Sequence, residues 1–306
     1  MKKVKQIDIS KGMSTNDLVK QMEASGVMGA GRIAKATNIF ELMIKDKDCK
    51  IFLGLAGAMV PGGMKNIIID MLKAGHVDVF VTTGANLTHD LVEALGYNHF
   101  QGSANVNDKE LHDKKIDRIY DSYMPNEVYE GMEDFFKKNI EHFKKKKMNI
   151  KEFLWLVGSL VPSENSILRI CYENKIPIFC PAIGDSGIGL MIWNHLVNGE
   201  EINVNVFDDL KEILDLAWTS KCGVVYLGGG VPKNYIQQAM QFSPEAASYG
   251  IQITMDRPEP GGSSGAELRE GISWGKMNFE GNFVDVISDI TIALPLIYSA
   301  VKERVE

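Results

Sequence analysis

The sequence predicts an α/β protein with a mostly parallel, doubly wound (Rossmann-like) sheet and helices on both of its faces. Short, almost continuously apolar runs alternate along the chain with amphipathic stretches of helical periodicity. Strands that are buried on both faces give such apolar runs, and the helices between them carry the crossovers of a parallel sheet. The chain has 306 residues, 45% of them hydrophobic and 24% charged, which is enough to bury the core of a large sheet.

The individual elements can be placed from these patterns. The expected strands are residues 51–56, 77–82, 176–180, 202–207, 223–227 and 250–254. The expected helices are residues 64–74, 88–95, 163–173, 208–220 and 233–241, a stretch from about 126 to the lysine run at 144–147, and a terminal helix at 290–305. We interpret the lysine run as a solvated helix end, because basic residues are favoured there.

A glycine motif near the start of the chain invites a different interpretation. Gly29-Ala-Gly-Arg-Ile-Ala34 matches a dinucleotide-binding fingerprint, but it follows a polar helical stretch. The fingerprint carries meaning only between a strand and a helix, so we interpret this segment as the start of a helix. No Pro/Gly-rich linker long enough to divide the chain is present, and we expect a single domain.

Composition excludes several classes of function. The net charge of −7 argues against general binding to nucleic acid or an anionic membrane, and it suits cationic ligands. Cysteines 49, 171, 180 and 222 form no CxxC pair and have no histidine at metal-ligand spacing, so we expect buried, reduced thiols and no metal site. The first residues lack a signal-peptide core, and no run approaches the ~20 apolar residues of a membrane span. We expect a cytoplasmic protein.

Small residues follow four of the expected strands, at 57–63, 83–86, 181–187 and 228–232. Ligands bind at the carboxyl ends of the strands in this architecture, and amides at the following helix N-termini suit a pyrophosphate. A dinucleotide site is the favoured interpretation, although such turns also occur for packing. Asp185, Asp256 and Asp289 lie near strand ends, where a carboxylate accepts from ribose hydroxyls or caps a turn.

The segment most suggestive of chemistry lies near the C-terminus. A flexible loop, Gly261-Gly-Ser-Ser-Gly265, precedes Glu270-Gly-Ile-Ser-Trp-Gly-Lys276. A lysine beside a tryptophan is held near apolar surface, where desolvation favours its neutral, nucleophilic form. Glu270 can hold a cationic substrate nearby. Lys233, in a Gly-rich loop, is the alternative nucleophile. It can equally be only the first residue of the following helix, without a chemical role.

Five motifs, in order over nearly the whole chain, resemble the deoxyhypusine synthase family, especially its shorter archaeal and bacterial members. They are Phe52-Leu-Gly-Leu-Ala-Gly-Ala58, Thr82-Thr-Gly-Ala-Asn-Leu-Thr-His-Asp90, Tyr123-Met-Pro-Asn-Glu127, Gly228-Gly-Gly-Val-Pro-Lys-Asn234 and Glu270-Gly-Ile-Ser-Trp-Gly-Lys276. The resemblance implies one NAD-binding domain over residues 1–306. It also implies transfer of the aminobutyl group of spermidine, through an enzyme-lysine imine, to one lysine of translation initiation factor 5A. A homotetramer with sites shared across a dimer interface is expected.

The resemblance assigns roles to individual residues. Lys276 corresponds to the catalytic nucleophile, Trp274 to the wall against the polyamine, and Glu270 to an amine-binding carboxylate. Asn234 and Ser263 fall at further substrate-binding positions. The implied contacts to NAD are Thr83, Gly84, Ala85, Asp185, Gly229, Asp256 and Asp289.

Four positions depart from the family pattern. Leu190 and Ser263 stand where aspartates are expected, Asn234 replaces a histidine, and His89 replaces a glutamate near the ribose. Two fewer carboxylates leave less negative charge for a triamine. An alternative is therefore a homospermidine synthase-like transfer to a small amine such as putrescine, without a protein acceptor. A third possibility, a non-catalytic NAD-binding paralogue, is disfavoured by the retained Lys276, Trp274 and Glu270.

Overall fold

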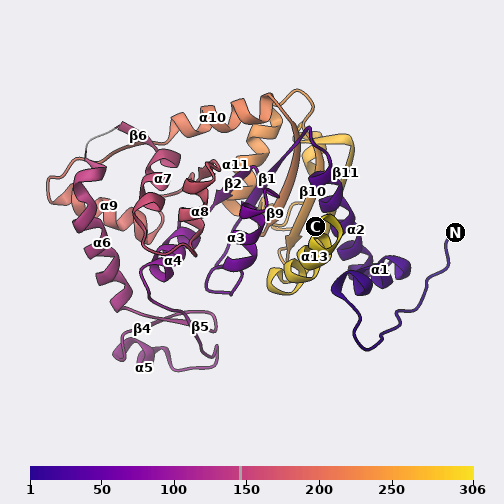
Figure 1. Cartoon of the computed structure of the whole chain (residues 1–306), viewed down its shortest axis with the longest axis horizontal. Coiled ribbons are helices and arrows are strands. Elements are labelled where there is room, and N and C mark those ends of the chain that lie inside the picture. Colours follow the sequence, from indigo (N-terminus) through magenta and orange to yellow (C-terminus); the bar gives the residue numbers. More distant parts are fainter. Residues whose placement is uncertain (145–146) are drawn as a thin grey trace. The chain divides into compact units, whose positions relative to one another are not determined.

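The computed structural model describes residues 1–144 and 147–306, and the chain divides into two compact units. The first unit is Met1–Ala56, His76–Val81 and Lys211–Glu306, and the second is Gly57–Gly75 and Thr82–Leu210 (Figure 1). The chain passes between the units more than once, and α10 (Phe207–Trp218) contains the last passage. The expectation of one NAD-binding domain over residues 1–306 stays a prediction.

A parallel β-sheet forms the core of the first unit, with strands in the order β11-β10-β9-β1-β2. These strands are β1 (Cys49–Leu55), β2 (Val79–Thr82), β9 (Lys221–Leu227), β10 (Ala247–Thr254) and β11 (Met277–Ile287). β1 pairs with β9 without a register shift, and β10 pairs in parallel with both β9 and β11. β1 and β9 are buried along nearly their whole length, which explains their continuous apolar sequence. Four predicted strands, 51–56, 77–82, 223–227 and 250–254, are confirmed.

Helices cover both faces of this sheet, as two residues of β9 demonstrate. Gly223 and Tyr226 are an odd number of positions apart and therefore face opposite sides. A Cβ at Gly223 would lie 3.0 Å from the sulfur of Met43 in α2 (Met28–Lys45). The Tyr226 ring instead lies 6.0 Å from Nζ of Lys233 in α11 (Gly230–Gln241). The predicted α/β class, with a mostly parallel sheet between helices, is confirmed.

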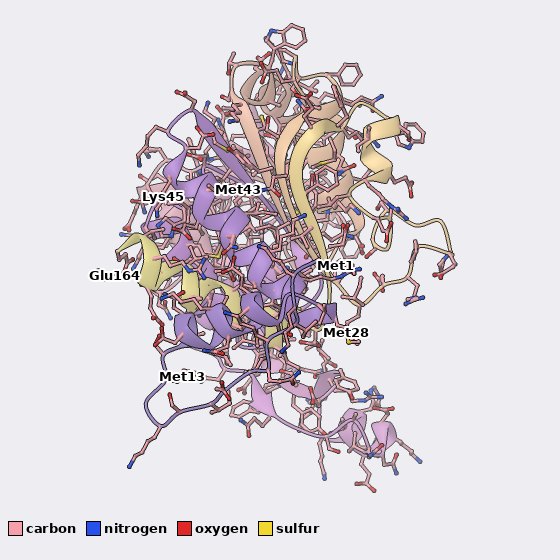
Figure 2. The ribbon with its side chains drawn as sticks, turned by 90° about the vertical axis from the view of Figure 1, so that its right-hand side faces the viewer. Met1, Met13, Met28, Met43, Lys45 and Glu164 are labelled. Atoms are coloured by element: carbon pink, nitrogen blue, oxygen red, sulfur yellow. The ribbon has the colours of Figure 1, made fainter. Side chains whose placement is uncertain are left out.

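The N-terminal helices pack against the C-terminal helix of the chain. α1 (Thr15–Ser25) and α2 lie beside α13 (Ile290–Val305), seen as indigo and yellow ribbons in Figure 1. Met28 and Lys45, labelled in Figure 2, mark the two ends of α2. Arg304 of α13 donates to the Asn16 side chain at 2.7 Å and pairs with Glu41 at 3.0 Å. The expected terminal helix over 290–305 is confirmed, and residues 29–34 lie inside α2, as the helical interpretation requires.

The second unit is built mainly from helices. They are α3 (Lys65–Lys73), α4 (Gly84–Ala94), α5 (Asp108–Asp113), α6 (Glu127–Phe143), α7 (Ile150–Leu160), α8 (Ile167–Glu173) and α9 (Gly187–Val197). An antiparallel sheet has the order β3-β5-β4, from β3 (Phe100–Gln101), β4 (Ile116–Ile119) and β5 (Ser122–Pro125). A parallel pair joins β6 (Lys147–Asn149) to β8 (Asn203–Asn205), and the short β7 (Ile178–Phe179) is buried.

One expected strand was wrong in its burial, one expected helix begins earlier, and one strand was not predicted. Residues 202–207 were expected to form a buried strand, but β8 is short, largely exposed and paired only in the two-stranded sheet, because its apolar residues alternate with Asn203 and Asn205. The helix expected at 88–95 begins at Gly84, because Thr83 caps it by accepting from the Asn86 amide at 3.3 Å. β11 was not predicted, since the exposed polar residues Glu280 and Asn282 interrupt its apolar sequence.

Two smaller expectations can be compared with the structure. α6 ends at Phe143, which confirms a helix end at the lysine run; residues 145 and 146 lie outside the described residues. The four cysteines are buried and unbridged as expected, and burial raises the pKa of Cys49, Cys180 and Cys222 to about 12. In the described part of the chain, no helix has the length and apolar character needed to cross a membrane.

Candidate active site

The Ser-Trp-Gly-Lys segment forms a helix-ending turn that fixes the position of Lys276. The short helix α12 (Glu270–Ser273) has Trp274 as its C-cap, and Gly275 follows with φ of +67°, in the left-handed region. The Lys276 amide donates to the carbonyl of Gly271 at 2.8 Å, and the Gly275 amide donates to Ile272 at 3.0 Å. These two bonds define a Schellman motif, which needs glycine at the left-handed position. The lysine is therefore held by backbone geometry directly before β11.

Lys276 lies over the face of Trp274. Its Nζ is 4.8 Å from the centroid of the indole ring, within the range of a cation–π contact. The Trp274 side chain is 57% exposed, so much of the ring surface remains available to another molecule. An amine and an aromatic face accordingly meet at the edge of the first unit, as the sequence motif suggested.

These residues line a pocket in the first unit with a cavity volume of about 140 Å³. All five residues predicted to form the catalytic and substrate-binding site contribute to its wall: Asn234, Ser263, Glu270, Trp274 and Lys276. The pocket lies between α11, the Gly/Ser loop that follows β10, and α12. The structure brings these five residues together; their individual roles stay predictions.

Polar groups of this wall are available to a ligand. Within residues 1–144 and 147–306, the carboxylate of Glu270 and the side-chain amide of Asn234 form no hydrogen bond or ion pair. The Ser263 hydroxyl is engaged only loosely, donating to the Gly230 carbonyl at 3.4 Å. A carboxylate, an amide and an amine around an aromatic face suit a ligand that is both cationic and aliphatic.

Lys233 closes the inner end of the pocket. Its side chain is buried, and its Nζ donates to the carbonyl oxygens of Ser263 and Ala266, each at 2.6 Å. Gln252 donates to the same Ala266 carbonyl at 3.0 Å, so both side chains anchor the Gly/Ser loop. Burial lowers the pKa of Lys233 to about 8, and the charge on Lys276 adds to this, while Asp285 and Glu270 act in the opposite direction.

Three predicted cofactor residues lie in the first unit, after three neighbouring strands. Gly229 follows β9 at the start of α11, and a Cβ there would lie 2.3 Å from Cα of Ser264. The Ser264 hydroxyl in turn donates to the carboxylate of Asp256, after β10, so Gly229 and Asp256 are brought together. Asp289, after β11, caps α13 by accepting from the Thr291 amide at 2.7 Å. Asp289 therefore caps a helix in this structure, which was the alternative to accepting from ribose hydroxyls.

The other four predicted cofactor residues, Thr83, Gly84, Ala85 and Asp185, lie in the second unit. A Cβ on Gly84 would be 2.4 Å from Cβ of Ser186 and 3.6 Å from the Asp185 carbonyl oxygen, so only glycine permits this approach. Asn86 accepts from the Met59 amide at 3.0 Å. Three of the four predicted small-residue loops therefore meet within this unit, around the N-terminus of α4.

His89 takes part in a buried chain of polar groups in the second unit. Its Nδ1 lies 2.9 Å from Nε2 of His99, and Nδ1 of His99 lies 2.8 Å from the carboxylate of Glu93. Glu93 also pairs with Lys65. Burial lowers the pKa of His89 to about 4, with a smaller contribution from His99, so the ring is neutral at pH 7. Leu190, the other departure in this unit, is 54% exposed on α9.

Comparison with known proteins agrees with this geometry. A family model described as deoxyhypusine synthase matches residues 17–301. The chain belongs to the deoxyhypusine synthase family. "Probable deoxyhypusine synthase 1" of Methanosarcina acetivorans is 44% identical over 98% of this chain and 95% of its own length. The protein of the same name from Archaeoglobus fulgidus is 41% identical over 97% of each chain.

The fold agrees as well. A solved structure from Entamoeba histolytica, provisionally named a deoxyhypusine synthase, covers 97% of this chain and 96% of its own, with a TM-score of 0.68 and 21% sequence identity. The likeness at this identity concerns the fold alone. The predicted resemblance is confirmed, and deoxyhypusine synthases transfer the aminobutyl group of spermidine in hypusine formation.

Some residues of this pocket were not predicted. Glu267 and Gln237 also line it, and Glu267 adds a second carboxylate to that of Glu270. The position of Glu267 between the Gly/Ser loop and the lysine motif was a usable signal, because both flanking segments were already singled out. Gln237 and His99 gave no such signal, because their partners are set by packing between separate elements.

Proposed function

We propose that this chain is an NAD-dependent deoxyhypusine synthase that transfers the aminobutyl group of spermidine through an imine on Lys276 to a lysine of translation initiation factor 5A. The observation that carries the proposal is the position of Lys276 Nζ, 4.8 Å from the Trp274 ring centroid, in a pocket with the unpaired carboxylate of Glu270. Family membership supports the aminobutyl transfer, and the pocket supports the identity of the nucleophile.

Each side chain of the pocket has a defined task in this reaction. The carboxylate of Glu270, with Glu267 nearby, attracts the ammonium groups of the polyamine. The exposed face of Trp274 packs along the methylene chain and stabilises a positive charge above it. Lys276, held by the Schellman turn, attacks the carbon of the substrate-derived imine and becomes the carrier of the aminobutyl group.

The chain offers positions suited to NAD. Gly229 is the N-cap of α11 and supplies no side-chain cap, so the first amides of the helix suit an anion, and the missing Cβ at Gly229 admits the backbone of Ser264. Asp256 and, in the second unit, Thr83, Gly84, Ala85 and Asp185 are the further residues that would hold the cofactor, with Asp289 as the helix-capping carboxylate after β11. Bound NAD would supply the oxidation of the amine and the later reduction of the transferred imine.

Mass spectrometry tests the proposal directly. Purified protein, NAD and spermidine are incubated with and without translation initiation factor 5A from the same source. A mass gain of one aminobutyl group on a single lysine of the factor is expected. Borohydride added during turnover should trap an amine adduct on Lys276, and an adduct on Lys233 instead would show that the nucleophile is misassigned.

A second function, homospermidine synthase-like transfer to a small amine, is favoured by one feature of the pocket. Ser263 and Asn234 both lie in its wall, at positions where the family pattern has aspartate and histidine. Formation of a new polyamine on addition of putrescine, with no modification of the protein factor, would establish this activity. Any NAD-dependent turnover that Lys276→Ala abolishes would exclude a non-catalytic paralogue.

We also propose that the protein is a cytoplasmic homotetramer. One apolar stripe supports self-association: Leu190, Trp193 and Val197 of α9 are 54%, 60% and 64% exposed and recur at helical spacing. Light scattering coupled to gel filtration should give four times the chain mass of 34.0 kDa. A monomer at micromolar concentration would contradict the proposed assembly and the expectation that sites are shared across a dimer interface.

A further inference from the structure

Two lysines line the same small pocket, and only one of them is needed as a nucleophile. Lys276 is half-buried against Trp274, whereas Lys233 is 3% exposed at the inner end of the cavity. A buried amine costs free energy unless its polar hydrogens are bonded, so its retention calls for a structural or chemical reason. The hydrogen bonds of Lys233 distinguish between these reasons.

The Nζ of Lys233 has two acceptors, the carbonyl oxygens of Ser263 and Ala266 at 2.6 Å each. No third acceptor for this amine lies within residues 1–144 and 147–306. A neutral amine has two N–H groups and one lone pair, so the two carbonyls satisfy it completely and leave the lone pair free. The protonated amine has a third N–H without a protein partner. The two carbonyls therefore hold the Lys233 nitrogen in one place. Its remaining hydrogen-bonding site is an acceptor when the amine is neutral and a donor when the amine is protonated.

The burial of Lys233 and the charges around it give this amine a pKa in the range that suits proton transfer. Burial lowers its pKa to about 8, Lys276 repels its charge, and the carboxylates of Asp285 on β11 and Glu270 on α12 oppose these effects. The ring of Tyr226 on β9 lies 6.0 Å away and carries no charge at neutral pH. Proton transfer is most effective from a group whose pKa lies near the operating pH.

We propose that Lys233 is a catalytic residue, the proton carrier of the imine exchange at Lys276. This inference rests on the proposed function, because it needs the imine that spermidine oxidation provides. The neutral amine of Lys276 attacks the carbon of the protonated imine, and its C–N bond forms while the imine π electrons move to the substrate nitrogen. Lys233 takes a proton from the attacking nitrogen and gives it to the departing nitrogen. The old C–N bond breaks, its electron pair leaves with 1,3-diaminopropane, and an imine to Lys276 remains, with no net oxidation.

The test measures how fast the Lys276 adduct forms. Borohydride quenching of a single turnover with NAD and spermidine gives this rate between pH 6 and pH 9.5. In the wild-type protein the rate should rise with pH and show an inflection near pH 8, as Lys233 becomes neutral. Lys233→Gln retains two N–H donors but cannot carry a proton. Its adduct should form about a hundredfold more slowly, within the ordinary range for loss of a general acid–base, and the inflection should disappear.

Gln252→Met is the matched structural control. Gln252 anchors the same Ala266 carbonyl and is equally buried, but it does not titrate. Its adduct rate should retain the inflection near pH 8. If Lys233→Gln retains the inflection or a rate within threefold of the wild type, or if Gln252→Met loses the inflection, the proton-carrier role is overturned.

The remaining outcomes are also decisive. If Lys233→Gln does not fold, the wild-type profile decides, and the absence of an inflection between pH 7 and pH 9 overturns the proposal. Failure of the proposed function gives a different result, since no adduct on Lys276 would then form in the wild-type protein at any pH. An adduct on Lys233 itself would make that residue the nucleophile and would overturn both assignments.

Discussion

Nδ1 of His89 lies 2.9 Å from Nε2 of His99, and Nδ1 of His99 lies 2.8 Å from the carboxylate of Glu93. In the neutral tautomer of His99 that donates from Nδ1 to Glu93, Nε2 can only accept. His89 must therefore donate from its own Nδ1, which leaves a lone pair on its Nε2. In this arrangement Glu93 sets the direction of the hydrogen bond between the two imidazole rings. Nε2 of His89 is then an acceptor at the position where the family pattern has a glutamate.

This arrangement predicts a loss of stability in acid. The pKa of His89 is lowered to about 4, against about 6.5 in an unfolded chain, so the unfolded state binds more protons between these values. The contribution of His89 to the free energy of unfolding is therefore fully present above about pH 6.5. It is lost as the pH decreases toward 4, and the loss is at most about 3 kcal/mol. The unfolding temperature measured from pH 7 to pH 4.5 should fall more in the wild type than in His89→Asn. Equal decreases in both proteins would contradict the assignment.

Gly275 should be needed for placing Lys276. A Cβ at this position meets no atom within 4 Å, so Gly275→Ala adds only the strain of a left-handed backbone, about 1–2 kcal/mol. Denaturant unfolding should show this loss of stability. The rate of adduct trapping on Lys276 should fall by more than the factor that corresponds to this free energy. Gly275→Asn, which tolerates the left-handed region better, should recover most of both. Unchanged trapping in Gly275→Ala would show that the Schellman turn does not position the lysine.

Trp274 should govern the affinity for the polyamine. Trp274→Ala removes an aromatic face worth about 1–2 kcal/mol to a bound cation, so KM for spermidine should rise about tenfold. Trp274→Phe should restore part of this affinity. Trp218→Ala removes a similarly exposed tryptophan from α10 and should leave KM unchanged. Steady-state kinetics at saturating NAD measures all three variants.

Gly229 should be required for cofactor binding. A Cβ there would lie 2.3 Å from the backbone of Ser264, so Gly229→Ala must displace the Gly/Ser loop, at a cost of about 1–3 kcal/mol. NAD affinity, measured by calorimetry, should fall at least tenfold. Gly262→Ala is the control in the same loop, because a Cβ there meets nothing within 4 Å. Comparable losses in both variants would indicate general loop sensitivity rather than a close approach at Gly229.

The sequence by itself determined the fold class, the strands β1, β2, β9 and β10, and five residues of the pocket. Continuous apolar runs predicted β1 and β9 because both of their faces are buried, and the Trp-Gly-Lys motif is local, so its neighbours in sequence are also neighbours in space. Tertiary structure decided what depends on contacts between distant segments: the alternating, exposed β8, the edge strand β11, the His89–His99 pair and the two carbonyl bonds of Lys233. Local patterns record burial and turn geometry, whereas the partner of a buried polar group is chosen by the packing of separate elements, and no local pattern in the sequence records that choice.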